Sequence, residues 1–202
     1  ALVFYMGVVI LGLFVHMGIT YMTLLKIFTT MDIKHFLKSM APVQLLGFST
    51  SSSGATLPVT MKRCEKDLGI SEEISSFVLP LGATINMDGT ALYQGVAAVF
   101  IAQAVGMDLT LANQFTIVAT AVLASIGTAA VPGAGIIMLI IILEAINVPS
   151  EGIALILGVD RILDMLRTVV NVTGDSTVST IVASSEKALK MNKNQMEIHN
   201  EE

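Results

Sequence analysis

The sequence predicts an all-α integral membrane fold with two re-entrant helical hairpins and several transmembrane helices, one of them broken, arranged as an inverted repeat. Of its 202 residues, 53% are hydrophobic and 13% are charged, whereas a soluble domain is about a quarter charged. Two apolar stretches are interrupted by tips of small residues. A further apolar stretch carries a stripe of charged side chains, and these three observations together predict the fold.

Residues 1–28 form the first predicted transmembrane helix. Its apolar run ends at Lys26, and about 20 apolar residues are enough to cross a bilayer. His16 is its one strongly polar side chain, and we expect this histidine to be packed or interfacial. The run begins without a charged leader, so we expect the chain to be the C-terminal part of a longer membrane protein.

Two stretches, 42–70 and 114–148, predict re-entrant hairpins. In each, short apolar arms flank a tip of small residues, SSSG at 51–54 and SIGTAAVPGAG at 125–135. Non-helical backbone is tolerated at membrane depth only where it is buried in protein or lines a cavity. For the first stretch, an ordinary Ser/Gly-rich loop in water is the alternative.

The stretch 74–105 predicts a broken transmembrane helix. It is apolar except at NMDGT, residues 86–90, where Asp88 is its one charged residue. An unwound helix exposes backbone carbonyls, and a carboxylate beside them makes an oxygen cage that suits sodium. The alternative is a simple kink in which Asp88 pairs with a neighbouring helix.

The stretch 152–184 predicts a long helix with one polar face. At 100° per residue, six polar side chains fall within an arc of about 100°. Ionisable groups in a membrane helix normally face the bundle interior or a water-filled site, so this face could bind both a cation and a zwitterion. A structural salt-bridge stripe is the alternative. The six residues are Asp160, Asp164, Arg167, Thr168, Asn171 and Asp175.

The order of hairpin, broken helix, hairpin and charged helix looks like one plan repeated twice, which is typical of secondary transporters. Nine of the eleven Lys and Arg residues lie in 26–66 and 187–193. The positive-inside rule therefore places these segments, including a charged tail at 185–202, in the cytoplasm. The first hairpin then enters from inside and the second from outside.

Several functions are disfavoured by what the sequence lacks. The single Cys64 cannot form an internal disulfide and has no metal-ligand cluster beside it. No basic patch indicates a nucleic-acid partner. No Ser-His-Asp or Cys-His set is present, so we do not expect an enzyme.

Four motifs, in this order, carry a family resemblance: SSSGATLP at 51–58, NMDGT at 86–90, SIGTAAVPGAG at 125–135 and DRILDMLRTVVNVTGD at 160–175. The chain resembles the C-terminal, transport-domain half of the glutamate/aspartate transporters in the dicarboxylate/amino acid:cation symporter family. The resemblance implies an inverted-repeat transport domain. The N-terminal half, absent here, would supply a scaffold that forms a homotrimer.

The resemblance also implies a substrate site. Arg167 would bind the substrate side-chain carboxylate, because its fork of donors fits a carboxylate bidentately, and Asp164 would bind the amino group. The other implied substrate residues are Ser53, Thr90, Val131, Gly135, Thr168 and Asn171.

Three sodium sites are implied by the same resemblance, with Na⁺ as the coupling ion. The first would use Gly82, Asn86, Asn171 and Asp175. The second would use carbonyls of Thr84, Ser125, Ile126 and Thr128. The third would use Asn86 and Asp88 together with a helix outside this chain.

The sequence departs from the family pattern at a few positions. Some relatives carry an arginine at the positions of Ser51 or Met165, whereas this chain carries Arg161. Arg161 is therefore a candidate for a compensating role, with Asp160 or Asp164 as its partner. Animal members carry a glutamate at the position of Gln94, which puts their proton route in doubt here.

The expected function is sodium-coupled symport of acidic amino acids, L-aspartate or L-glutamate, by alternating access. The expected setting is a multi-pass protein of the plasma (cell inner) membrane, in contact with the lipid bilayer. A proton-coupled symporter of glutamate or C4-dicarboxylates is the alternative. An anion channel lined by the charged helix is a third hypothesis, from another class.

Overall fold

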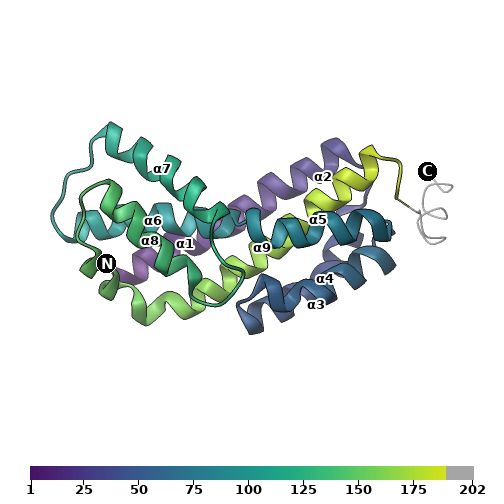
Figure 1. Cartoon of the computed structure of the whole chain (residues 1–202), viewed down its shortest axis with the longest axis horizontal. Coiled ribbons are helices and arrows are strands. Elements are labelled where there is room, and N and C mark those ends of the chain that lie inside the picture. Colours follow the sequence, from purple (N-terminus) through teal and green to yellow (C-terminus); the bar gives the residue numbers. More distant parts are fainter. Residues whose placement is uncertain (190–202) are drawn as a thin grey trace.

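The computed structural model describes residues 1–189 of the chain, and the described part is helical, as predicted. Figure 1 shows an elongated molecule in which most helices run close to its long axis. The helix α9, Leu157–Ser185, extends through both halves of the molecule and contacts each of the helices from α1 to α6. The long polar helix predicted from the sequence is therefore the element around which the others pack.

The first span is a continuous helix with an irregular centre. It consists of α1 (Leu2–Val15), the π-helical turn η1 (His16–Tyr21) and α2 (Met22–Phe28). Within residues 1–189, Leu2–Phe28 is the one helix that is both long and apolar enough to cross a membrane, with a hydropathy of 2.3. Single π-helical turns are rare and frequently mark functional sites.

Two helices, α3 (Ile33–Thr50) and α4 (Ser53–Lys66), pack against each other through a short turn. The first helix begins nine residues before the predicted hairpin boundary at 42, because the Asp32 side chain caps it by accepting from His35 N at 2.8 Å. Ser52 caps the second helix by accepting from Ala55 N at 3.1 Å. A charged first turn thus extends α3 beyond its apolar part, and α4 continues through charged residues to Lys66.

The second pair is α7 (Leu111–Ile126) and α8 (Ala134–Ala145), which also contact each other. Residues 127–133 between them are not helical, and Gly133 has φ +78°. A short 3₁₀ helix, η2 (Ser150–Leu155), then leads into α9.

The helix between the two pairs is broken. It consists of α5 (Glu72–Ile85) and α6 (Asp88–Ala104), separated by Asn86 and Met87. These two residues have ψ angles of 77° and 54°, outside the helical range. The break exposes backbone groups beside the middle of α9.

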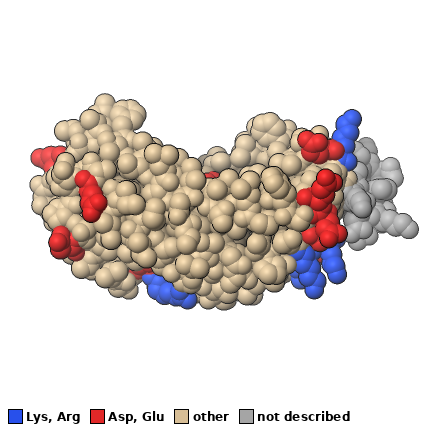
Figure 2. Space-filling view, in the orientation of Figure 1, with Lys and Arg blue, Asp and Glu red and all other residues tan. Residues whose placement is uncertain are grey.

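Two apolar cores flank the polar middle of the molecule, and α9 contributes to both. The first includes Tyr5, Leu13, Tyr93, Leu139, Ile142 and Leu163. The second includes Leu25, Phe36, Val43, Leu79 and Val172. Figure 2 shows most charged side chains at the two ends of the molecule, with Lys and Arg mainly at the end formed by α2, α4 and α5. Most of the predicted charged tail, 190–202, lies outside the described residues.

Candidate functional site

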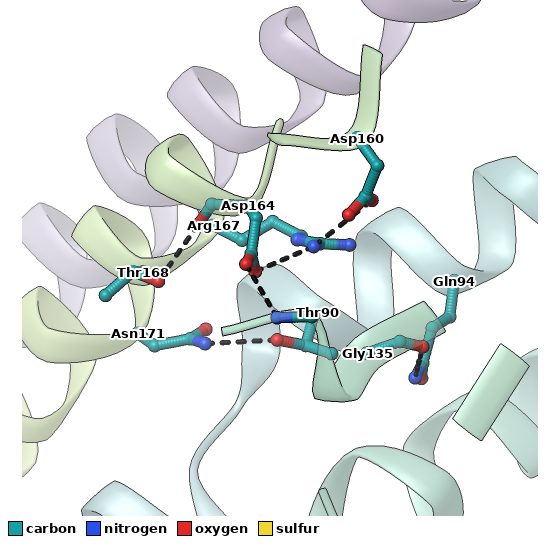
Figure 3. Close-up of polar contacts among 9 residues, drawn as sticks. Thr90, Gln94, Gly135, Asp160, Asp164, Arg167, Thr168 and Asn171 are labelled. Atoms are coloured by element: carbon teal, nitrogen blue, oxygen red, sulfur yellow. Dashed lines mark hydrogen bonds and ion pairs between the residues drawn. The ribbon is translucent and has the colours of Figure 1, made fainter. Parts of the chain in front are cut away.

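Arg167 lies at the centre of the site and is 1% exposed. Its Nη2 is 2.7 Å from Asp164 Oδ1 and 3.3 Å from Asp160 Oδ1 (Figure 3). The guanidinium carbon lies 3.6 Å from the centroid of the Tyr93 ring, an arrangement in which the ring face attracts the cation. Nε and Nη1 have no hydrogen-bond partner within the described part of the chain. A buried donor without a partner is costly, so these two nitrogens indicate a place for an anionic ligand.

Asp164 connects α9 to the tip before α8. Its Oδ2 accepts a hydrogen bond from Gly133 N at 3.0 Å. A Cβ at Gly135, two residues later, would be in tight contact with the site, at 3.1 Å from Thr90 Cγ2 and 3.4 Å from Arg167 Nη1. The Gly135 carbonyl accepts from Gln94 Nε2 at 3.0 Å. The tip is thus held directly against the guanidinium.

Asn171 connects α9 to the start of α6. Its Nδ2 donates to Thr90 Oγ1 at 3.1 Å, and its Oδ1 accepts from Gly89 N at 2.9 Å. Thr168, on the same face, donates to the Asp164 carbonyl at 2.9 Å. Along this face of α9, Asp164 and Arg167 thus contact the second tip and Asn171 contacts the start of α6, whereas the Thr168 hydroxyl bonds within α9.

The two tips touch each other above this cluster. Ala130 O accepts from Ser52 Oγ at 2.7 Å and from Gly54 N at 3.2 Å. Ser53 lies between Ser52 and Gly54 in the sequence and is 5% exposed. Val131, which follows Ala130, is 57% exposed. The contact joins α4 to the α7–α8 turn, and together they cover the site.

Asp175 forms a second polar site on α9, about one turn beyond Asn171 and two turns beyond Arg167. It is 4% exposed, and its Oδ1 accepts from Asn86 Nδ2 at 2.8 Å. Gly82 lies so close that a Cβ there would be 2.8 Å from Asp175 Oδ1. No ion pair in residues 1–189 includes Asp175. A buried carboxylate with amide neighbours and no cationic partner fits a bound cation.

The remaining predicted cation ligands are more dispersed. Asp88 contacts His16 and Tyr21 rather than Asn86, in agreement with the alternative in which it pairs with a neighbouring helix. Thr84 is exposed and donates to Leu81 O, whereas Ser125 and Thr128 are buried and donate to carbonyls of α7. Ile126 is 47% exposed. The described residues contain no group of three or more His, Cys, Asp or Glu side chains that could hold a metal ion.

The structure corrects one expectation about Arg161. We expected it to pair with Asp160 or Asp164, but both carboxylates pair with Arg167, and Arg161 is exposed. Arg161 follows Asp160 directly, and adjacent helix residues do not face each other. Asp164 is three residues away from Arg161, but its two oxygens are bound by Arg167 and by Gly133 N.

Sequence reasoning missed several contacts of the site. The stacking of Tyr93 on the guanidinium and the bond between Ser52 and Ala130 were not predicted. The aromatic residue next to Gln94 was a visible signal for the first. No signal in the sequence identified the second, because it joins two tips far apart in the chain.

Helices around a buried guanidinium, a helix break and two touching tips are the features of a secondary membrane transporter. The model of the Sodium:dicarboxylate symporter family matches residues 1–185. The chain belongs to this family, as the sequence predicted; it is a membrane protein of a transporter family and not an enzyme.

Relatives with curated names support the same assignment. Excitatory amino acid transporter 3 of Mus musculus is 46% identical over 197 residues, which are 98% of this chain and 37% of the relative. Excitatory amino acid transporter 2 of Homo sapiens is 45% identical over 178 residues, 88% of this chain and 31% of the relative. An excitatory amino acid transporter of Caenorhabditis elegans is 42% identical over 187 residues, which are 93% of this chain and 37% of the relative. The chain spans between 31% and 37% of the length of these relatives.

Proposed function

We propose that this chain is the transport-domain part of a sodium-coupled symporter that carries L-aspartate or L-glutamate across the plasma membrane. The observation that carries this proposal is the buried guanidinium of Arg167, whose Nε and Nη1 have no partner in the described residues. Both nitrogens belong to a charged group, and hydrogen bonds from a guanidinium to a carboxylate are charge-assisted and strong. The side-chain carboxylate of an acidic amino acid is an anionic ligand of that kind.

The groups around Arg167 supply the rest of an amino-acid site. Asp164 carries a negative charge beside the guanidinium and would bind the substrate ammonium group. Thr168 and Asn171 present a hydroxyl and an amide on the same face. Ser53, Thr90, Val131 and Gly135 would line the site from the two tips and from the start of α6. The touching tips support closure over the substrate.

Asp175 supports the sodium part of the proposal. The residues that fit a cation there are Gly82, Asn86, Asn171 and Asp175, since they bring a carboxylate, two amides and a backbone that approaches closely. A sodium ion would supply the positive charge that this buried carboxylate lacks. We assign a second ion to the carbonyls of Thr84, Ser125, Ile126 and Thr128, and a third to Asn86 and Asp88.

The arrangement in the membrane is part of the same proposal. We propose that 42–70 and 114–148 are re-entrant hairpins of an inverted repeat, and that 1–28, 74–105 and 152–184 span the bilayer. Opening and closing of the tips on opposite sides would give alternating access. The protein would assemble as a homotrimer through a scaffold that lies outside this chain.

Uptake into proteoliposomes tests the function. The full-length protein, reconstituted and supplied with labelled L-aspartate, should accumulate it when an inward sodium gradient is imposed, and choline should not replace sodium. Each sodium ion that enters down the membrane potential contributes about 2.3 kcal/mol per 100 mV. Uptake driven by a pH gradient without sodium would refute the sodium-coupled proposal and favour the proton-coupled alternative.

A further inference from the structure

The π-helical turn η1 brings two side chains of the first span onto one carboxylate of the broken helix. Tyr21 donates its hydroxyl to Asp88 Oδ2 at 3.1 Å, and His16 Nε2 lies 3.3 Å from the same oxygen. The two rings pack edge to face, with centroids 4.8 Å apart. A regular α-helix has 3.6 residues per turn, so side chains five residues apart do not line up on it. His16 and Tyr21 reach the same carboxylate because the π-helical turn between them is wider.

The two aromatic residues leave one side of Asp88 free. Both use Oδ2, and the Asp88 side chain is 41% exposed, whereas Tyr21 is 2% exposed. The buried tyrosine therefore fixes the direction of the carboxylate from behind. Within residues 1–189, the other carboxylate oxygen has no hydrogen-bond partner and could bind a ligand.

The Tyr21 hydroxyl also lies against the site around Asp175. A Cβ at Gly174 would be 2.5 Å from Tyr21 Oη and 2.9 Å from Asn86 Nδ2. That amide nitrogen is the group that donates to Asp175. One hydroxyl thus lies between the Asp88 carboxylate, the backbone of α9 and the helix break that holds Asn86.

We infer that Tyr21 is a positioning residue for cation binding, which orients the Asp88 carboxylate and fixes the helix break beside Asp175. The inference rests on the proposed sodium-coupled function. Groups that hydrogen-bond to an ion-binding carboxylate keep it oriented, and their loss typically lowers ion affinity by about 10–100-fold. If Tyr21 acts only by packing, removal of its hydroxyl alone leaves the ion affinity unchanged.

The test is the substitution Tyr21→Phe in the full-length protein, with Tyr5→Phe as the matched control. Tyr5 is 1% exposed on the same span, and its hydroxyl makes no hydrogen bond to Asp88. The thermal midpoint is measured against sodium concentration, without substrate, at constant ionic strength kept with choline. L-Aspartate affinity is measured separately at saturating sodium.

Tyr21→Phe should keep the parent's thermal midpoint in choline and raise the sodium concentration for half-maximal stabilisation by about tenfold. Its aspartate affinity at saturating sodium should stay within threefold of the parent, and Tyr5→Phe should match the parent in the sodium titration. A sodium midpoint of Tyr21→Phe within twofold of the parent would overturn the inference while leaving the proposed function intact. A parent protein that sodium does not stabilise would overturn the proposed function and this inference together.

Discussion

Arg167→Ala removes the guanidinium that lies between two carboxylates at the centre of the site. In the parent, Nη2 is paired with Asp160 and Asp164, whereas Nε and Nη1 have no partner in residues 1–189. A charge-assisted hydrogen bond from either of these nitrogens to a substrate carboxylate is worth about 1.5–3 kcal/mol. Its loss should weaken L-aspartate binding by about 10- to 150-fold.

The substitution also affects folding, so two further variants are needed. Without Arg167, Asp160 and Asp164 lose their cationic partner, and a broken buried ion pair costs about 3–5 kcal/mol of stability. Arg167→Lys keeps the charge but not the planar fork. It should restore the thermal midpoint toward that of the parent while aspartate binding stays at least about tenfold weaker. Arg161→Ala, on the same helix at an exposed position, should leave both quantities unchanged.

The assay is calorimetric titration of L-aspartate into each purified full-length variant at saturating sodium, alongside a thermal scan. If Arg167→Lys or a folded Arg167→Ala binds aspartate within threefold of the parent, the guanidinium is not the substrate ligand. The assignment of the substrate site would then be wrong.

Three further predictions concern the second polar site, the tip and the buried thiol. Gly82→Ala places a Cβ 2.8 Å from Asp175 Oδ1 and should weaken sodium-dependent stabilisation by about tenfold; an unchanged sodium titration would contradict the assigned site. A Cβ at Gly133 would meet no atom within 4 Å, but Gly133 has φ +78°, so Gly133→Ala should cost about 1–2 kcal/mol of unfolding free energy. Gly95→Ala, in α6, should instead stabilise the protein by about 0.5–1 kcal/mol. Equal shifts of the thermal midpoint in the two variants would refute this. Cys64 is 0% exposed, so it should react with a maleimide only after denaturation. Mass spectrometry of the treated protein measures the labelling.

The helical class and the polar face of α9 could be predicted because both depend on local pattern. Hydropathy indicates which segments avoid water, and the spacing of Asp164, Arg167 and Asn171 places them on one face. The structure buries this face, with Arg167 at 1% and Asn171 at 4% exposure. The family assignment followed from the same motifs and is confirmed by the match over residues 1–185.

Helix boundaries were harder to predict, because hydropathy reports the environment of a segment and not its secondary structure. The charged residues of 29–39 indicate water, yet α3 already begins at Ile33. Its start depends on a side-chain cap from Asp32, which acts equally well in water. α4 likewise continues to Lys66 through charged residues, and near its end Arg63 pairs with Asp67 at 2.8 Å.

Contacts between distant segments were not predictable from one sequence. The bond from Ser52 to Ala130 spans 78 residues, and the contact between His16 and Asp88 spans 72. We expected His16 to be packed or interfacial, and the structure places its ring against a carboxylate. No local pattern indicates that pairing, because it depends on how the first span lies against the helix break.

We propose that a sodium-dependent site in this chain recognises an acidic amino acid. Calorimetric binding of L-aspartate to the full-length protein, in sodium and in choline, tests it most directly. We predict tight binding in sodium and none in choline, because the buried Asp175 needs a cation before the helix break and the tips can close around the ligand. Aspartate binding of equal strength in both salts would contradict the claim.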